Sequence, residues 1–313
     1  VIRILNYTMS SGGLENLGLS QKNLDKINKL IKMPNGIIMV TGATGSGKST
    51  TVYSMLQILN TVSRNIITVE DPVEMKIAGI NQVQVMSDIG LTFGNTLRSI
   101  LRQDPDVIMI GEIRDDETAR IAVRASITGH LVLSTIHTNN SLNTIERLLD
   151  MEVERYLLGS ALTGIISQRL VKRLCPKCRT SRPTTNYEKI LFEKVLGKEV
   201  NEVYVPQGCS ECINGYSGRI ALHEVLEITQ EIRDAITNNI RKNELRNLVY
   251  KKSDVISLLE DGLEKVVAGL TSVDEILRVI DVDDDIGEED TDIKDAFIGK
   301  TTNNLTTGEI ETL

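Results

Sequence analysis

Four short apolar runs alternate with helical patterns in the first half of the chain. The runs are Ile37–Val40, Ile66–Val69, Val107–Ile110 and Leu131–Ile136, and each has a polar residue at or just past its end. Continuous runs of this kind are typical of strands buried on both faces of a parallel sheet. Apolar residues at helical spacing follow Lys48 and recur between Asp115 and Gly129. Alternating strands and helices predict an α/β fold with a mainly parallel sheet.

A glycine-rich loop joins the first run to the helix after it. The segment Gly42–Ser49 matches the phosphate-loop pattern G-x-x-x-x-G-K-[ST] at every position. Glycines let backbone N–H groups converge on phosphate oxygens, and the helix N-terminus adds positive partial charge. Lys48 is expected to neutralise the outer phosphates of ATP, and the Ser49 hydroxyl to ligate Mg²⁺. The predicted nucleotide-binding residues are Gly42, Ala43, Thr44, Gly45, Ser46, Gly47, Lys48, Ser49 and Thr50.

Acidic residues follow the second and third runs: Glu70, Asp71, Glu74 and Glu112. Carboxylates at strand ends can orient the attacking water or hold Mg²⁺ through water. Gly111 stands where an aspartate often coordinates the metal. Mg²⁺ would then rely on Ser49, the phosphates and waters, with Glu70 or Glu112 behind them. Our hypothesis is that Glu70 orients the lytic water and that Glu112 organises Mg²⁺ and its waters. The alternative for Glu112 is a helix cap or an ion pair with Arg114, and Asp71 and Glu74 have the same simple alternatives.

Two histidines flank the fourth run. His130 and His137 are seven positions apart, which is roughly 23 Å along a straight strand. His137 lies at the carboxyl end and is predicted to sense the γ-phosphate. A structural or subunit-contact role is favoured for His130. His223 carries no signal and is treated as an ordinary side chain.

The four cysteines form two C-x-x-C pairs: Cys175 with Cys178, and Cys209 with Cys212. Two such pairs in a chain with no secretion signal favour a metal over disulfides. Four thiolates complete a tetrahedron around Zn²⁺, so the predicted site is closed and structural. Four buried free thiols are the alternative.

Five successive segments are predicted along the chain. They are the end of an N-terminal domain with a linker and helix (1–32), a RecA-like ATPase core (33–172), a tetracysteine zinc-binding subdomain (173–213), a mainly helical part (214–280) and an acidic disordered tail (281–313). The chain lacks an initiator Met and opens on strand-like residues, so we expect it to be a fragment of a longer protein.

Charge is concentrated in that tail. Residues 281–313 hold 11 acidic and 2 basic residues, a net of −9, so the total of −8 leaves about +1 for the body. A near-neutral body gives no electrostatic reason to expect a nucleic-acid partner. No apolar run approaches the roughly 20 residues of a membrane helix.

Together these motifs resemble those of the type II secretion and type IV pilus assembly ATPases over about residues 1–280. The matching segments, in family order, are the phosphate loop Gly42–Ser49, an acidic box Arg64–Glu74, an atypical Walker B segment Leu101–Asp115, a histidine box Thr128–Thr138 and the tetracysteine. Pilus retraction ATPases look similar but typically lack the tetracysteine, which favours the assembly or secretion branch.

The resemblance implies a hexameric ring that hydrolyses ATP and moves a platform protein of the inner membrane. It further implies a cytoplasmic location at the inner face of that membrane. Arg3 falls where the family has one of its arginine fingers. Other fingers would lie upstream, so weak turnover is expected of this chain alone.

Pilus assembly is the first hypothesis, and pseudopilus assembly in a type II secretion system is its alternative. A DNA-translocating or recombinase ATPase would need basic loops, which the near-neutral body disfavours. A nucleotide-dependent scaffold that barely hydrolyses ATP is disfavoured by the intact set of Lys48, Glu70 and Glu112.

Overall fold

The computed structural model describes residues 13–280, so Arg3 and the acidic tail lie outside the described residues. The chain forms two compact units. Of the described residues, the first unit contains residues 13–169 together with His223–Ile256, and the second contains Leu170–Leu222 together with residues 257–280. Each unit draws on two separate stretches of sequence. The five successive segments expected from the sequence remain predictions.

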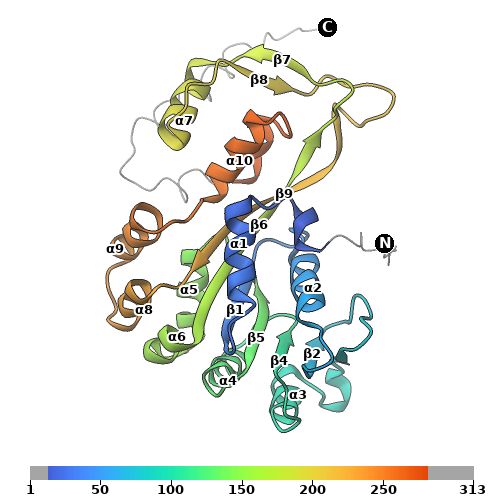
Figure 1. The fold of residues 1–313 in the computed structure, drawn as a ribbon, viewed down its shortest axis with the longest axis vertical. Coiled ribbons are helices and arrows are strands. Elements are labelled where there is room, and N and C mark those ends of the chain that lie inside the picture. Colours follow the sequence, from blue (N-terminus) through green and yellow to red (C-terminus); the bar gives the residue numbers. More distant parts are fainter. Residues whose placement is uncertain (1–12, 281–313) are drawn as a thin grey trace, which may run out of the picture. The chain divides into compact units, whose positions relative to one another are not determined.

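A seven-stranded sheet has the strand order β3-β2-β4-β5-β1-β6-β9 (Figure 1). Its strands are β1 (Gly36–Thr41), β2 (Ile66–Glu70), β3 (Asn81–Gln84), β4 (Val107–Ile110), β5 (Leu131–Ile136), β6 (Leu162–Leu174) and β9 (Tyr216–Glu227). Every neighbouring pair from β3 to β6 is parallel. The four predicted strands are therefore present, and the mainly parallel α/β fold is confirmed.

Helices cover both faces of this sheet in the first unit. They are η1 (Leu14–Leu17), α1 (Gln21–Leu30), α2 (Lys48–Leu59), η2 (Ser87–Ile89), α3 (Phe93–Ile100), α4 (Asp116–Ile127), α5 (Ser141–Asp150), α6 (Arg155–Ala161), α8 (Gln230–Thr237), α9 (Lys242–Asn247) and η3 (Leu248–Lys252). Successive residues of β1 point to opposite faces: Ile37 and Met39 join the core shared with α3 to α6 and α8, while Ile38 and Val40 join the core shared with α1 and α2. Burial on both faces explains why the strands are apolar throughout.

The segment after residue 213 differs from the sequence-based expectation. Tyr216–Glu227 is a long strand, β9, so the prediction of a mainly helical pattern was wrong there. Its buried part contains His223 and Glu224, both fully buried. These polar residues interrupt the apolar run by which a buried strand is normally recognised.

The second unit has its own small sheet and its own core. Strands β7 (Thr180–Pro183) and β8 (Glu202–Val205) pair antiparallel, and the helices are α7 (Asn186–Leu196), α10 (Leu258–Val267) and α11 (Val273–Val279). Phe192, Leu222 and Leu263 are among the buried side chains of its core. A capping box between Thr185 and Glu188 starts α7.

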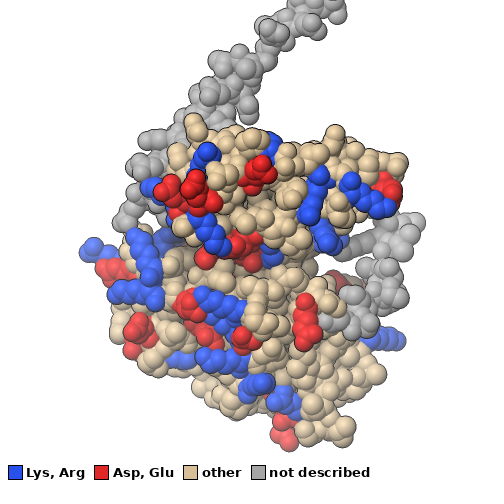
Figure 2. Space-filling view, turned by 45° about the horizontal axis from the view of Figure 1, so that its top comes forward, with Lys and Arg blue, Asp and Glu red and all other residues tan. Residues whose placement is uncertain are grey.

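Within residues 13–280, no helix combines the length and the apolar character that a membrane crossing requires. Figure 2 shows one face of the molecule, where basic and acidic side chains are interspersed. Mixed charges of this kind give that face no extended field of one sign.

Candidate functional site

The phosphate loop lies between the carboxyl end of β1 and the start of α2. Gly42, Gly45 and Gly47 have φ values of 153°, 77° and 91°. A Cβ atom on Gly42 would lie 2.3 Å from the carbonyl oxygen of Gln168, so this position admits only glycine. Gly47 is the N-cap of α2 and offers no capping side chain. The first amides of the helix therefore have no side-chain competitor for an anion.

Lys48 is held over this loop. Its Nζ donates to the carbonyl oxygens of Gly42 at 2.8 Å and Ala43 at 3.2 Å, and the residue is 9% exposed. Burial lowers the pKa of Lys48; the Glu112 carboxylate opposes this effect and the Arg169 guanidinium adds to it. A partly desolvated cation interacts more strongly with a phosphate than one in bulk water does.

His137 connects Lys48 to Glu112. Its Nδ1 lies 3.4 Å from Nζ of Lys48, and its Nε2 lies 3.0 Å from Oε1 of Glu112. Because an ammonium only donates, Nδ1 accepts from Lys48 when the ammonium is charged, and Nε2 carries the hydrogen that faces the carboxylate. The start of α2 and the segments after β4 and β5 thus contribute one polar side chain each to a continuous chain of contacts.

Glu112 has a second partner. Nε of Arg114 donates to its Oε2 at 2.8 Å, so the ion pair weighed as an alternative is present together with the His137 contact. A Cβ atom on Gly111 would lie 3.3 Å from Cα of Glu70, and the Gly111 amide donates to the Val69 carbonyl at 2.7 Å. Close packing of β4 against β2 therefore explains why a glycine stands at this position.

Glu70, the last residue of β2, is 3% exposed and already hydrogen-bonded. Its Oε1 accepts from the hydroxyl of Thr68 at 2.5 Å and the amide of Gln82 at 3.0 Å, and its Oε2 accepts from the Tyr53 hydroxyl. Burial and the Glu70 carboxylate raise the pKa of Tyr53, which keeps its hydroxyl a donor. Oε2 retains one acceptor position for a further group. Among the described residues, no hydrogen bond joins Glu70 to Lys48 or His137.

The remaining predicted loop residues lie around the start of α2. Ser49 is half-buried, and Thr50 is exposed with its carbonyl bound by Ser54. The Oγ of Ser46 is buried and has no hydrogen-bond partner among the described residues. A buried hydroxyl without a partner is costly, so it fits a loop that acquires polar contacts from a bound phosphate. The glycine turns and the Lys48 ammonium fit the same ligand.

The other two histidines lie elsewhere. Nδ1 of His130 donates to the carbonyl oxygen of Ala125 at 2.9 Å, near the C-terminus of α4. The structural or subunit-contact role favoured for His130 stays a prediction. His223 is fully buried in β9, and its backbone carbonyl accepts from the side chain of Asn23 at 3.1 Å.

Sequence reasoning missed three polar residues around the phosphate loop: Tyr53, Gln168 and Arg169. Tyr53 lies on α2 among apolar neighbours, and its contact with Glu70 spans 17 residues. Gln168 and Arg169 lie in the apolar strand β6, and both are buried. A polar pair inside a buried strand is a usable signal, because such groups are normally hydrogen-bonded.

The four cysteines meet at one point in the second unit. Their sulfur atoms lie within 4.8 Å of one another. The Sγ–Sγ distances are 4.0 Å for Cys175 with Cys209, 3.6 Å for Cys178 with Cys212 and 3.6 Å for Cys209 with Cys212. A tetrahedron with Zn–S bonds of 2.3 Å has edges of about 3.8 Å, so these thiols fit a closed four-sulfur zinc site.

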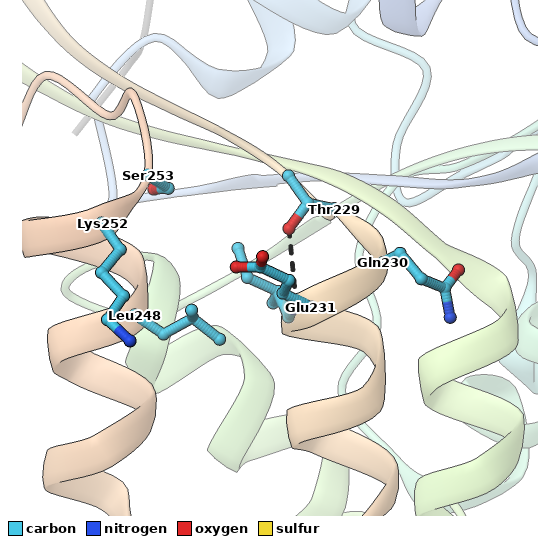
Figure 3. A pocket seen from close by; sticks show the side chains of 7 residues that line it. Thr229, Gln230, Glu231, Leu248, Lys252 and Ser253 are labelled. Atoms are coloured by element: carbon cyan, nitrogen blue, oxygen red, sulfur yellow. Dashed lines mark hydrogen bonds between the residues drawn. The ribbon is translucent and has the colours of Figure 1, made fainter.

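A pocket in the first unit lies apart from this chemistry. It has a volume of about 340 Å³ and is lined by Thr229, Gln230, Glu231, Ile232, Leu248, Lys252 and Ser253. Figure 3 shows the Thr229 hydroxyl turned to the start of α8, where it accepts from the Ile232 amide at 3.4 Å. The pocket contains none of the predicted site residues.

Comparison with known proteins agrees with the motifs. The family model described as "Type II/IV secretion system protein" matches residues 1–278. The chain is 50% identical over 280 residues to the putative type II secretion system protein E of Escherichia coli, covering 89% of the chain and 56% of that protein. It is 45% identical to the type II secretion system ATPase E of Vibrio cholerae, covering 89% of the chain and 55% of that protein. The chain thus spans just over half the length of these relatives.

Solved structures show the same fold. The pilus retraction motor PilT, solved with bound ADP, has a TM-score of 0.64 at 31% identity over 85% of this chain and 66% of its own. The Legionella pneumophila ATPase DotB has a TM-score of 0.63 at 26% identity over 85% and 64%. Given the match over nearly all of its length, this chain belongs to the type II/IV secretion system protein family.

Proposed function

We propose that this chain is the ATP-hydrolysing motor of a type II secretion system, acting as part of a hexameric ring at the inner face of the cytoplasmic membrane. The observation that carries the proposal is the contact chain from Lys48 through His137 to Glu112, beside a complete phosphate loop. The pilus assembly favoured first from the sequence has less support, because the relatives cited above are named for type II secretion.

Each predicted residue takes a definite part in this proposal. The phosphate loop binds ATP, Lys48 neutralises its outer phosphates, and Ser49 ligates Mg²⁺. Glu70 orients the attacking water, Glu112 organises Mg²⁺ and its waters, and His137 senses the γ-phosphate. Arg3 supplies an arginine finger to the ring, although it lies outside the described residues. Zn²⁺ on the four cysteines stabilises the second unit.

The product of the motor is mechanical work on another protein. By the family resemblance, the partner is a polytopic platform protein of the inner membrane, and the movement drives pseudopilus assembly. The face in Figure 2 has mixed charge and presents no basic stripe of the kind that a nucleic-acid backbone would bind.

The test compares Lys48→Ala with Lys32→Ala, an exposed lysine after α1. Lys48→Ala should abolish ATP binding or turnover, because phosphate charge is left uncompensated in a desolvated loop, a loss of about 1.5–3 kcal/mol or more. Lys32→Ala should behave as the wild type. In cells, Lys48→Ala should trap secreted proteins in the periplasm. Normal secretion with lost pili would support the pilus alternative, and ATP binding without turnover in the wild type would support a scaffold.

A further inference from the structure

The phosphate loop packs against strand β6. The carbonyl oxygen of Gln168 is 2.3 Å from the position that a Cβ on Gly42 would take, so the loop packs directly on the strand backbone. Gln168 is 2% exposed, and its side chain bonds to one residue of the loop and to one residue in the first turn of α2. Its Nε2 donates to the Ser46 carbonyl at 2.8 Å, and its Oε1 accepts from the Thr51 hydroxyl at 2.7 Å. A buried amide with a donor bond and an acceptor bond fixes both partners.

The next residue of β6 reaches the loop that follows His137. Nη2 of Arg169 donates to the backbone oxygen of Asn139 at 2.9 Å and to its Oδ1 at 3.1 Å, while Nη1 donates to the Gln168 carbonyl at 3.2 Å. Nη1 also lies 3.2 Å from the position of a Gly42 Cβ. The planar guanidinium therefore holds Asn139 through Nη2 while Nη1 stays bonded to the Gln168 carbonyl on which Gly42 packs, a geometry that an ammonium cannot reproduce.

We propose that Gln168 and Arg169 are a pair of positioning residues that couples the phosphate loop to the loop carrying His137. Gln168 holds the phosphate loop in its binding shape, and Arg169 sets the position of Asn139 and therefore of His137. This inference rests on the proposed function, since it concerns how the same site is held. Lys48 and His137 belong to different segments, and Nζ of Lys48 lies 3.4 Å from Nδ1 of His137. To keep this contact, other residues must fix the two segments relative to each other.

We expect the protein to stay folded when one member of the pair is changed, because the same region has a further contact. The hydroxyl of Thr41 accepts from the Thr138 amide at 3.1 Å and ties the His137 loop to the end of β1. The two residues should therefore affect function more than folding, and they should do so differently. Gln168 acts on nucleotide affinity, whereas Arg169 acts on turnover.

The experiment first measures binding of a fluorescent ATP analogue with Mg²⁺ and steady-state hydrolysis in the wild-type protein. Gln168→Met should weaken affinity about tenfold, equivalent to about 1.4 kcal/mol, with turnover at saturating ATP near the wild-type value. Arg169→Met should lower turnover about tenfold with little change in affinity, which corresponds to the same energy. Arg169→Lys should recover only part of that loss.

Thr51→Val and Thr51→Ser provide a second route to the Gln168 contact. Thr51→Val removes the hydroxyl at nearly constant volume and should weaken affinity like Gln168→Met, whereas Thr51→Ser keeps it and should not. Combining Thr51→Val with Gln168→Met should add little to the loss seen in Gln168→Met, because that variant already lacks the contact with Thr51. If Gln168→Met does not fold, the Thr51 pair decides the question.

A wild-type protein that does not bind ATP would overturn the proposed function and this inference together. Wild-type binding with unchanged affinity in Gln168→Met and Thr51→Val, or unchanged turnover in Arg169→Met, would overturn the inference alone. An equal loss of affinity and turnover in every variant would also overturn it, because the two residues would then have no separate tasks.

Discussion

Nε2 of His137 lies 3.0 Å from Oε1 of Glu112, so the histidine after β5 and the acid after β4 form one unit. On its other side the same ring faces Lys48. If Lys48 binds a phosphate as proposed, a charge change there would be one hydrogen bond away from the imidazole and two from the carboxylate. This arrangement explains how one histidine could report the γ-phosphate to an acidic residue that it does not neighbour in sequence.

His137→Ala should lower ATP turnover by about 100-fold while affinity for Mg·ATP changes little. The reason is that Lys48 keeps its contacts with the Gly42 and Ala43 carbonyls, whereas Glu112 loses its imidazole partner. His130→Ala is the matched control, because His130 lies at the opposite end of β5 from His137 and its side chain bonds to the Ala125 carbonyl. Steady-state kinetics of both variants measure whether turnover falls in His137→Ala alone. An equal loss of turnover in the two variants would refute the sensor role.

Glu70 and Glu112 should respond differently to loss of their charge. Glu70→Gln should bind Mg·ATP but lose hydrolysis, since an amide cannot take the proton of the attacking water. Glu112→Gln should also lose turnover, and in addition it should shift the Mg²⁺ concentration needed for activity. A Mg²⁺ titration of the hydrolysis rate measures both. The two roles must be exchanged if only Glu70→Gln shifts the Mg²⁺ requirement.

Tyr53→Phe provides a finer test of Glu70. The substitution removes the hydroxyl that donates to Oε2 and leaves the ring in the core. If Glu70 is the water-orienting base, this change should alter turnover without abolishing it, because Thr68 and Gln82 still hold Oε1. Asp71→Asn, at an exposed neighbour, should have no comparable effect. A complete loss in Tyr53→Phe would instead indicate that the tyrosine is itself essential.

Two kinds of site residue could be predicted from the sequence: those in a motif of consecutive residues and those near the carboxyl ends of strands. Gly42–Ser49 is recognisable because its chemistry depends on consecutive residues. Lys48, Glu112 and His137 could be expected to meet, because parallel strands bring their carboxyl ends to one edge of the sheet. The residue spacing alone could not indicate that His137 would contact both partners.

The missed part depends on contacts between distant segments. Gln168 meets Ser46 across 122 positions, and nothing in the sequence around β6 indicates which loop packs on it. The prediction failed at β9 for a related reason. Glu224 is fully buried there and accepts from the Ser141 amide at 3.0 Å and from the Tyr250 hydroxyl at 3.1 Å. Hydrogen bonds from distant residues thus stabilise a buried carboxylate in a segment whose sequence is more polar than that of a typical buried strand.

Zinc content is the direct test of the cysteine cluster. Freshly prepared protein should contain one Zn²⁺ per chain, and Cys175→Ser with Cys178→Ser should lose it. Since zinc binding contributes to folding, the second unit should lose hydrogen-exchange protection while β1 and α2 stay protected. Ser210→Ala, between the second pair of cysteines, should keep the metal. Elemental analysis that finds no zinc in the wild type would contradict the proposed zinc site.

The last prediction concerns Glu188 in the second unit. Its side chain is 1% exposed and accepts two hydrogen bonds from Arg182, at 2.6 and 2.7 Å, and one from the Thr185 amide at 2.8 Å. Burial alone would raise the pKa of Glu188, but these donors outweigh it and hold the pKa below its ordinary value of 4.5. A carboxyl whose pKa is lowered in the folded state stabilises the fold above its unfolded pKa.

The stabilisation should therefore be complete at neutral pH and disappear as the pH falls through the lowered pKa of the folded state. Glu188→Gln should destabilise the second unit at neutral pH by about 1.5–3 kcal/mol, because the charge-assisted bonds to Arg182 are lost. The difference from the wild type should shrink on acidification, when the wild-type carboxyl is protonated as well. The free energy of unfolding in urea, followed with a probe in α7 at neutral pH and across the acid range, measures this difference between the variant and the wild type. Glu193→Gln, which changes an exposed acid of the same helix, is the control. A difference that stays constant with pH would mean that Glu188 acts through its shape and not through its charge.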